Sequence, residues 1–291
     1  MTRERSMAFE RRLPSVRRLC VKGVLPSAAG RLLSAAGALL LLLPLALALA
    51  APTGTEQVAR QLNVAVAANF FGTLQKLAPK FQQASGIELL LSSGASGQFY
   101  TQIREGAPFD LLLSADADRP RQLETDGLAI PGSRFTYAVG TLVLWSPKAG
   151  VVDHDGKVLD GSGYRMIGIA EPHNAPYGAA AQQVLASLGL WDKLNQDKKL
   201  AVGENINQAW QFAASGNVDM AFVALSQVSS DGVIAGSYWL PPQSLYAPLD
   251  QDAVILTRTG KRAAAAAFMN WLRKDPQAIA TIKAAGYHVR E

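Results

Sequence analysis

The chain of 291 residues contains a single cysteine, Cys20. One thiol cannot form an intramolecular disulfide or build a cysteine-based zinc site. Cys20 also precedes the apolar run of residues 39–49, whereas the acylated cysteine of a lipoprotein follows such a run. The sequence therefore excludes a disulfide scaffold, a cysteine metal site and a lipid anchor at this residue.

Histidine is almost as scarce, because only His154, His173 and His288 are present and they lie far apart in the sequence. The segment Asp153–Gly156 resembles the start of a calcium-binding loop, but its twelfth position holds Tyr164 where that loop needs glutamate. We therefore predict a solvated turn at Asp153–Gly156. His173 is expected either in a turn or beside the ligand cleft predicted below.

Two common catalytic motifs are also missing: the nucleophile elbow Gly-x-Ser-x-Gly and the phosphate-loop lysine motif. The nearest match, Gly94-Ala95-Ser96-Gly97, has the wrong spacing, and the sequence places no base for Ser96. We therefore expect a protein that is not an enzyme, with any ATP hydrolysis left to a separate subunit. A secreted hydrolase that uses His173 as its base is the alternative.

Positive charge is concentrated at the start of the chain. Eight of the 28 basic side chains, but only two of the 23 acidic ones, lie in the first fifty residues. This basic segment, the apolar run of residues 39–49 and the small residues at Ala48-Leu49-Ala50 are typical of a signal peptide. The run contains Pro44 and is shorter than the roughly 20 apolar residues that span a membrane. We predict that residues 1–50 direct export to the periplasm and are then cleaved.

The remainder of the chain is close to neutral. After residue 50 there are 20 basic and 21 acidic side chains, which give a net charge of −1. The basic character of the whole chain therefore belongs to the leader, and we expect no binding to nucleic acid.

Apolar strand patterns alternate with helical ones after residue 60, which is typical of an α/β fold. We expect strands at 62–68, 87–91, 109–114, 137–145, 166–170, 200–202, 220–225 (followed by a loop) and 253–257. We expect helices at 70–84, 99–105, 119–125, 179–188, 206–215, 262–274 and 277–285.

The same pattern predicts two lobes, each a mostly parallel sheet flanked by helices. Residues 51–140 and 245–291 are assigned to the first lobe and residues 141–244 to the second, because extended stretches near 137–146 and 241–258 join the two units. Two crossings of this kind act as a hinge. A cleft between lobes is a usual place for a small ligand.

Four strand-to-helix junctions, two in each predicted lobe, are built mainly from small residues. The first turn of a helix carries N–H groups without intrahelical partners at the positive end of the helix dipole, so it binds anions without a basic side chain. In an open α/β sheet these junctions lie at the carboxyl ends of the strands, where ligands bind. The alternative is that Asn69 and Ser96 are ordinary N-caps. The junctions are residues 64–70, 92–97, 175–178 and 203–206.

Such donors favour one class of ligand. Molybdate, tungstate and sulfate are fully deprotonated near neutral pH and only accept hydrogen bonds. Phosphate keeps a proton near pH 7 and favours a site with a carboxylate acceptor. The junctions therefore predict a receptor for a small, fully deprotonated oxyanion.

Several segments, in order over nearly the whole chain after residue 60, carry a family resemblance: Ala-Val-Ala-Ala-Asn-Phe at 65–70, Gly-Ala-Ser-Gly-Gln-Phe-Tyr at 94–100, Gly-Ala-Pro-Phe-Asp at 106–110, Leu-Ser-Ala-Asp at 113–116, Ala-Pro-Tyr-Gly at 175–178, Gly-Glu-Asn-Ile at 203–206 and Phe-Val-Ala-Leu-Ser-Gln at 222–227. Together they resemble the periplasmic molybdate-binding proteins. The resemblance implies a two-lobed type II periplasmic-binding fold. It also implies a monomer that delivers molybdate to an ABC permease with a separate ATPase subunit. Tungstate is a second ligand that the resemblance allows, and sulfate or another oxyanion is the alternative.

The resemblance also implies the ligand-binding residues. Asn69 and Ser96 are expected to bind the oxyanion from the first lobe, with the backbone of Ala68 beside them. Tyr177 and the backbone N–H of Ile206 are expected to bind it from the second lobe. The metal enters only as the molybdenum of molybdate, without direct ligation, and no resident cofactor is expected. One branch of the family has a ligand-binding tyrosine where this chain has Ala224, which leaves one hydrogen bond to be supplied by another residue.

Overall fold

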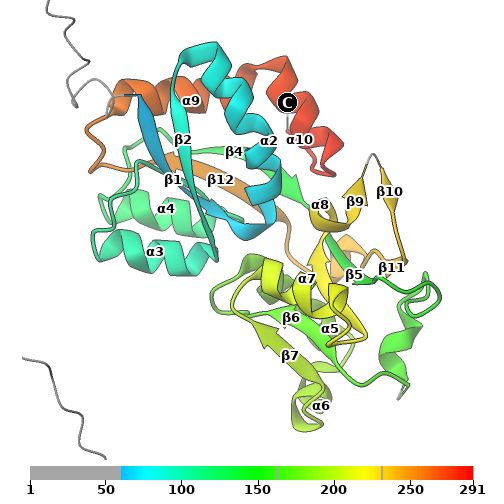
Figure 1. The fold of residues 1–291 in the computed structure, drawn as a ribbon. Helices are drawn as coiled ribbons and strands as arrows, with labels where there is room; N and C mark the ends of the chain where they lie inside the picture. The colour runs from blue at the N-terminus through cyan, green and yellow to red at the C-terminus, as the bar shows by residue number, and fades with distance from the viewer. Residues whose placement is uncertain (1–59, 162, 231, 291) are drawn as a thin grey trace, which may run out of the picture. The chain divides into compact units, whose positions relative to one another are not determined.

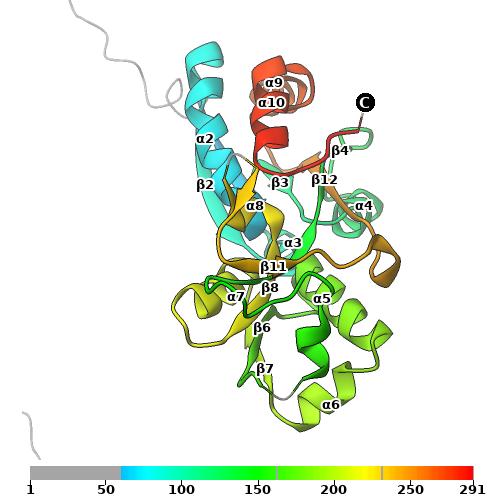
Figure 2. The same ribbon diagram turned by 90° about the vertical axis from the view of Figure 1, so that its right-hand side faces the viewer.

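The computed structural model describes residues 60–161, 163–230 and 232–290. The predicted signal peptide, residues 1–50, lies outside these residues. The described chain forms two five-stranded sheets, each covered by helices on both faces (Figure 1). Figure 2 shows the elements of the first sheet above those of the second. The predicted α/β class with two lobes is confirmed.

The first sheet has the strand order β2-β1-β3-β12-β4. Successive side chains of β1 point to opposite faces of the sheet, and each face is covered by helices. Leu62, Val64 and Val66 pack toward α2, α9 and α10, whereas Ala65 packs toward α3 and α4. The strands are β1 (Gln61–Ala67), β2 (Glu88–Gly94), β3 (Leu111–Leu113), β4 (Phe135–Gly140) and β12 (Leu249–Ile255). The helices are α2 (Ala68–Ser85), α3 (Ser96–Arg104), α4 (Asp118–Thr125), α9 (Arg262–Lys274) and α10 (Pro276–Ala284).

The second sheet has the order β11-β5-β8-β6-β7. Leu142 and Leu144 of β5 belong to the core under α5 and α6, whereas Val143 and Trp145 face the layer that contains α7. The strands are β5 (Leu142–Ser146), β6 (Ile167–Ala170), β7 (Leu200–Gly203), β8 (Met220–Ala224) and β11 (Ser237–Trp239). The helices are α5 (Pro176–Ser187), α6 (Trp191–Gln196), α7 (Ile206–Ala214) and α8 (Leu225–Val228); β9 (Ser229–Ser230) and β10 (Val233–Ile234) form a separate hairpin.

Both sheets are mixed rather than mostly parallel. In the first sheet β1 pairs in parallel with β2 and β3, but β12 is antiparallel to β3 and β4. In the second sheet β6 is parallel to β7 and β8, but β5 is antiparallel to β8 and β11. The reason is the chain path: the strands that leave and re-enter a lobe run in opposite directions, and neighbours of this kind pair antiparallel.

The predicted elements differ from the structure in several details. The single strand expected at 137–145 is two strands, β4 and β5, which belong to different sheets on either side of Thr141. The loop expected after 220–225 begins with the short helix α8, and α6 was not predicted. The helix expected at 262–274 is α9, with the predicted bounds. In the described part of the chain no helix is both long and apolar enough to cross a membrane.

Candidate oxyanion-binding site

The carboxyl ends of strands from both sheets meet around one small cavity. The centre of a water molecule can move through only about 10 Å³ of it. The five residues expected to bind the ligand all line this cavity, and each is at most 4% exposed: Ala68, Asn69, Ser96, Tyr177 and Ile206. The other lining residues are Ala67, Gly94, Ala95, Ala115, Ala175, Pro176 and Asn205.

Three helices begin at this cavity without a side-chain cap. The N-cap residues of α2, α3 and α5 are Ala67, Ala95 and Ala175, and none of them accepts a hydrogen bond from the first turn. Helices normally begin with Ser, Thr, Asp or Asn, whose side chain satisfies one of these N–H groups. A buried helix start that lacks such a cap needs an acceptor from elsewhere. The starts of these three helices therefore place at the cavity backbone N–H groups that no N-cap side chain satisfies.

The fourth helix, α7, is capped, but its cap leaves one donor unused. Asn205 Oδ1 accepts hydrogen bonds from the N–H groups of Asn207 at 3.0 Å and Gln208 at 3.2 Å. Ile206, the first residue of the helix, precedes both of these positions and lines the cavity. Its N–H is thus the first-turn donor that the Asn205 cap does not satisfy.

Ser96 is a cavity donor rather than an N-cap. It is the first residue of α3, after the N-cap Ala95, and its side chain is fully buried. Its Oγ accepts a hydrogen bond from the N–H of Ala115 at 2.9 Å. Because the hydroxyl already receives this hydrogen, its own hydrogen is available to a ligand. The alternative that Asn69 and Ser96 are ordinary N-caps is wrong, since Asn69 is the second residue of α2.

The side chain of Asn69 belongs to a buried network instead. Its Nδ2 donates to Gln251 Oε1 at 2.9 Å and to Tyr287 Oη at 3.1 Å, which accounts for both amide hydrogens. Tyr287 Oη also donates to the Asn69 carbonyl at 2.8 Å. The Asn69 side chain is thus engaged within the protein, which leaves its backbone N–H, in the first turn of α2, as the donor that it can offer to a ligand. The motif at 65–70 could not reveal this, because the network partners lie 182 and 218 residues later.

Tyr177 is the one aromatic residue that lines the cavity, and its hydroxyl accepts a hydrogen bond from Gln251 Nε2 at 3.1 Å. Burial raises the pKa of Tyr177 well above its usual value, and the neighbouring Tyr287 adds to the effect. The hydroxyl consequently keeps its hydrogen at neutral pH and can donate it.

No charged side chain is among the residues that line the cavity. Glu204, the one carboxylate within the four junctions, is exposed and is not among them. An anion here would meet only neutral donors. Hydrogen bonds from neutral donors to an ionised acceptor are worth roughly 1.5–3 kcal/mol each.

Two hydrogen bonds join the elements of the two sheets beside the cavity. The N–H of Gly97 donates to the carbonyl of Asn174 at 2.8 Å, and Arg119 Nη2 donates to the carbonyl of His173 at 2.6 Å. The Arg119 guanidinium also pairs with Asp116. These contacts hold the loop before α5 against the starts of α3 and α4.

Other residues raised by the sequence lie outside the cavity. His173 is not a lining residue, and its N–H donates to Glu171 Oε1, which fits the predicted turn. Ala224 is fully buried at the end of β8 and does not line the cavity either. Asp153 accepts hydrogen bonds from the N–H groups of Asp155, Lys157 and Val158, so the predicted turn is confirmed. Among the described residues no group of three His, Cys, Asp or Glu could hold a metal ion.

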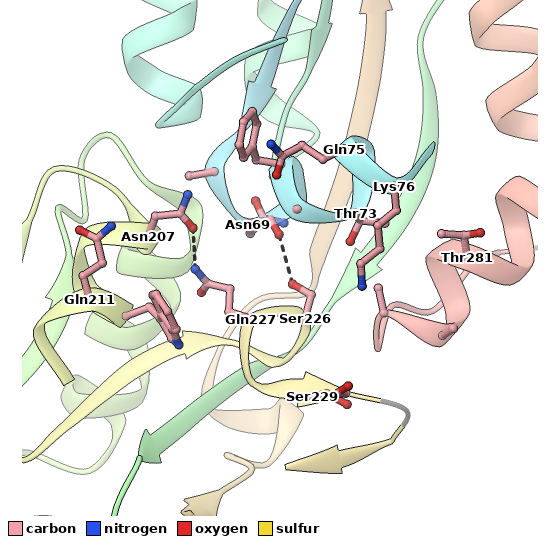
Figure 3. A pocket seen from close by; sticks show the side chains of 17 residues that line it. Asn69, Thr73, Gln75, Lys76, Asn207, Gln211, Ser226, Gln227, Ser229 and Thr281 are labelled. Atoms are coloured by element: carbon pink, nitrogen blue, oxygen red, sulfur yellow. Dashed lines mark hydrogen bonds between the residues drawn. The ribbon is translucent and has the colours of Figure 1, made fainter. Parts of the chain in front are cut away.

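A larger groove adjoins the cavity and shares Ala68 and Asn69 with it. Its volume is about 690 Å³, and it lies between α2, α7, α8 and α10 (Figure 3). Lys76 is the one charged side chain among its lining residues. Figure 3 shows Gln227 bonded to Asn207 and Ser226 bonded to Asn69, so this wall of the groove is tied to the starts of α7 and α2.

Comparison with known proteins agrees with this geometry. A family model described as bacterial extracellular solute-binding protein matches residues 62–288. The molybdate-binding protein ModA of Azotobacter vinelandii is 49% identical over 230 residues, which are 79% of this chain and 90% of the relative. The chain belongs to the bacterial extracellular solute-binding proteins, in the group of ModA.

A second relative and a solved structure support this membership. ModA of Rhodobacter capsulatus is 46% identical over 252 residues, which are 87% of this chain and 95% of the relative. The solved structure of the Azotobacter vinelandii periplasmic molybdate-binding protein has a TM-score of 0.77 and 48% identity, and covers 79% of this chain and 100% of that one. The resemblance drawn from the motifs and the two-lobed type II fold are therefore confirmed.

Proposed function

We propose that this protein is a periplasmic receptor that captures molybdate between its lobes and delivers it to an ABC permease with a separate ATPase subunit. The observation that carries the proposal is the meeting of four helix starts, three with alanine N-caps, at one buried cavity without charged side chains. The relatives at 46–49% identity, named as molybdate-binding proteins, support the choice of ligand.

We assign five groups to the ligand. Ser96 and Tyr177 would each donate a hydroxyl hydrogen, and Ala68, Asn69 and Ile206 would donate backbone N–H groups. The assignment of Asn69 to its backbone rests on the use of both Nδ2 hydrogens within the protein. Five such hydrogen bonds are sufficient for micromolar to nanomolar affinity after the cost of ordering the ligand.

The lobes that close on the ligand would be residues 51–140 with 245–291 and residues 141–244. The sheet membership of β4, β5, β11 and β12 supports these boundaries. Ligand contacts from both lobes would favour the closed form, which is the form a permease can distinguish. In this proposal residues 1–50 are the cleaved signal peptide and the receptor is a monomer.

Isothermal titration of the purified protein with molybdate, sulfate and phosphate tests the function. We expect one-to-one binding of molybdate that excess sulfate displaces only weakly, and no heat from phosphate. Tighter binding of sulfate would make the protein a sulfate receptor. Absence of heat from all three anions would refute the oxyanion function.

Ser96→Ala tests the site. Loss of one hydroxyl donor to an ionised ligand should weaken binding by roughly 10-fold or more. Ser229→Ala, which removes a hydroxyl from the adjoining groove, is the matched control and should bind as the wild type does. Equal affinity for the Ser96 variant and the wild type would disprove the assignment.

A further inference from the structure

Gln251 of β12 lies behind the cavity, fully buried and outside its lining. Its Oε1 accepts from Asn69 Nδ2 at 2.9 Å, and the Tyr137 hydroxyl lies 3.1 Å from the same oxygen. Its Nε2 donates to Tyr177 Oη at 3.1 Å. One amide thus connects β12 and α2 of the first sheet's unit with α5 of the second.

The backbone beside this amide leaves room for the contact. At Gly140, the last residue of β4, a Cβ atom would lie 2.0 Å from Tyr177 Oη and 2.6 Å from Gln251 Nε2. Any side chain there would separate the two groups. The place where the chain leaves the first sheet is therefore shaped so that Tyr177 can reach Gln251.

The direction of this hydrogen bond decides what Tyr177 can do. A tyrosine hydroxyl has one hydrogen, and a glutamine N–H that donates to its oxygen leaves that hydrogen for another acceptor. Ser96 is held in the same way by the N–H of Ala115. Both cavity hydroxyls therefore receive a hydrogen from the protein and offer their own to the ligand.

We infer that Gln251 is a positioning residue that fixes the Tyr177 hydroxyl as a donor and so selects oxyanions that carry no proton. The inference rests on the proposed oxyanion-binding function and deepens it. A fully deprotonated ligand finds donors at both hydroxyls. A singly protonated anion such as hydrogen phosphate must also donate, and the hydroxyls that could have accepted are already turned toward the ligand as donors.

A double-mutant cycle in the full-length protein tests whether Gln251 acts through Tyr177. Gln251→Met keeps a side chain of similar size without the amide, and should weaken molybdate binding by about 10-fold. In a Tyr177→Phe background the same change should alter affinity less than 3-fold, because the hydroxyl that Gln251 orients is gone. Additive losses would overturn the proposal, since a merely structural role does not depend on Tyr177.

Gln251→Glu adds a readout in pH. A protonated glutamic acid can donate to Tyr177 as the amide does, whereas the carboxylate can only accept and turns the Tyr177 hydrogen away from the ligand. The titratable side chains bonded to residue 251 are Tyr137 and Tyr177. Tyr246 and Tyr287 act on Tyr177, and Asp116 and Asp252 act on Tyr137. Burial raises the pKa of all four tyrosines, so they stay neutral in this range. Molybdate affinity of this variant should fall at least 10-fold between pH 6 and 9, while that of the wild type stays level. The fall should be clearly smaller in the Gln251→Glu/Tyr177→Phe double variant. An equal fall there would overturn the inference, because repulsion between the carboxylate and the anion does not need the hydroxyl.

Gln183→Glu is the matched control. Gln183 is on the exposed side of α5, where its Oε1 accepts from the N–H of Ala247, and the same change there should leave affinity level with pH. A level profile for Gln251→Glu, with thermal unfolding confirming a folded protein, would overturn the inference. Failure of the wild type to bind any oxyanion would instead overturn the proposed function, so the two failures are distinguishable.

Discussion

The small cavity and the groove beside it share two residues but differ in almost every other respect. The groove is far larger, with about 690 Å³ against about 10 Å³, and it contains the charged side chain of Lys76. The cavity has no charged lining residue, yet four helix starts converge on it. Burial is the reason that we propose the smaller space as the anion site, because a donor that has lost its water gains more from a ligand than an exposed ammonium does.

The largest expected effect is on stability, and it arises from three buried tyrosines, of which Tyr177 lines the cavity and Tyr137 and Tyr287 lie behind it. Burial raises the pKa of Tyr137, Tyr177 and Tyr287 above the usual 10. Above pH 10 the unfolded chain loses these protons while the folded chain keeps them, so the free energy of unfolding falls as pH rises. Each group contributes up to about 1.4 kcal/mol per pH unit.

Urea unfolding at pH 8, 9, 10 and 11 measures this effect. We expect nearly constant stability up to pH 9 and a steep loss above pH 10. Tyr287→Phe removes one of the three titrating groups, so the free energy of unfolding should fall less steeply with pH in this variant. If the free energy of unfolding falls with pH as steeply in that variant as in the wild type, the loss of stability above pH 10 has another origin.

The next effect is on ligand affinity and comes from a single N–H group. Ile206→Pro removes the first-turn donor of α7 while keeping a residue that helices favour at this position. The extended backbone of Asn205, with φ −150° and ψ 175°, is compatible with a following proline. We expect molybdate binding to weaken roughly 10- to 150-fold, as for loss of one hydrogen bond to an ionised acceptor.

Titration calorimetry on the proline variant and on Ile206→Ala separates the donor from the side chain. Ile206 is 3% exposed, so both substitutions lose packing, but only the proline removes the N–H. If the two variants bind molybdate equally, the backbone of Ile206 is not a ligand donor.

A smaller loss of ligand affinity is expected from a substitution at Gly97, where an element of the first sheet's unit contacts an element of the second. In Gly97→Ala the new Cβ would lie 2.9 Å from Asn174 Cα and 3.0 Å from its carbonyl oxygen, so the loop before α5 must move away. We expect affinity to fall about 3- to 10-fold, because closure becomes less favourable although no donor is removed.

Gly72→Ala is the same change on the wall of the groove, where a Cβ meets nothing within 4 Å. It should leave affinity unchanged and stabilise α2 slightly, by roughly 0.5–1 kcal/mol. Calorimetry on Gly97→Ala and Gly72→Ala measures the ligand affinity of each variant, and thermal unfolding measures its stability. A loss of affinity in the Gly72 variant would show that the groove takes part in closure.

The smallest effect is expected from the groove's one charge. Lys76 is exposed, and screening by salt reduces its field at the cavity. Lys76→Gln should change molybdate affinity less than 2-fold at 0.15 M salt and slightly more at low salt. A 10-fold loss at physiological salt would mean that the groove, rather than the helix starts, supplies the attraction for the anion.

Local sequence was sufficient to find the wall of the cavity but not what lies behind it. The small residues at 64–70 and 92–97 mark helix starts within a few positions, because strand and helix periods change there. Asn69 was expected to bind the oxyanion, but nothing in the local sequence indicated which of its groups would do so. Its actual partners, Gln251 and Tyr287, come from the other end of the chain, and no spacing rule connects residues so far apart.

The fold shows the same limit. Residues 137–145 are apolar apart from Gly140 and Thr141, and these two residues are too weak a signal to reveal that β4 and β5 belong to different sheets. Buried strands carry apolar residues on both faces and thus lose the alternation that reports a change of environment. The four residues of α8 are too few for a helical period to appear.

The long separation in sequence between Asn69 and its network partners has a consequence for biosynthesis. The start of α2 is made early, but the groups that hold Asn69 follow 182 and 218 residues later. A chain interrupted before Tyr287 would carry every proposed ligand donor and still lack a group that fixes one of them. The hydrogen bonds that fix the start of α2 can therefore form only after the last segment of the first lobe has been synthesised.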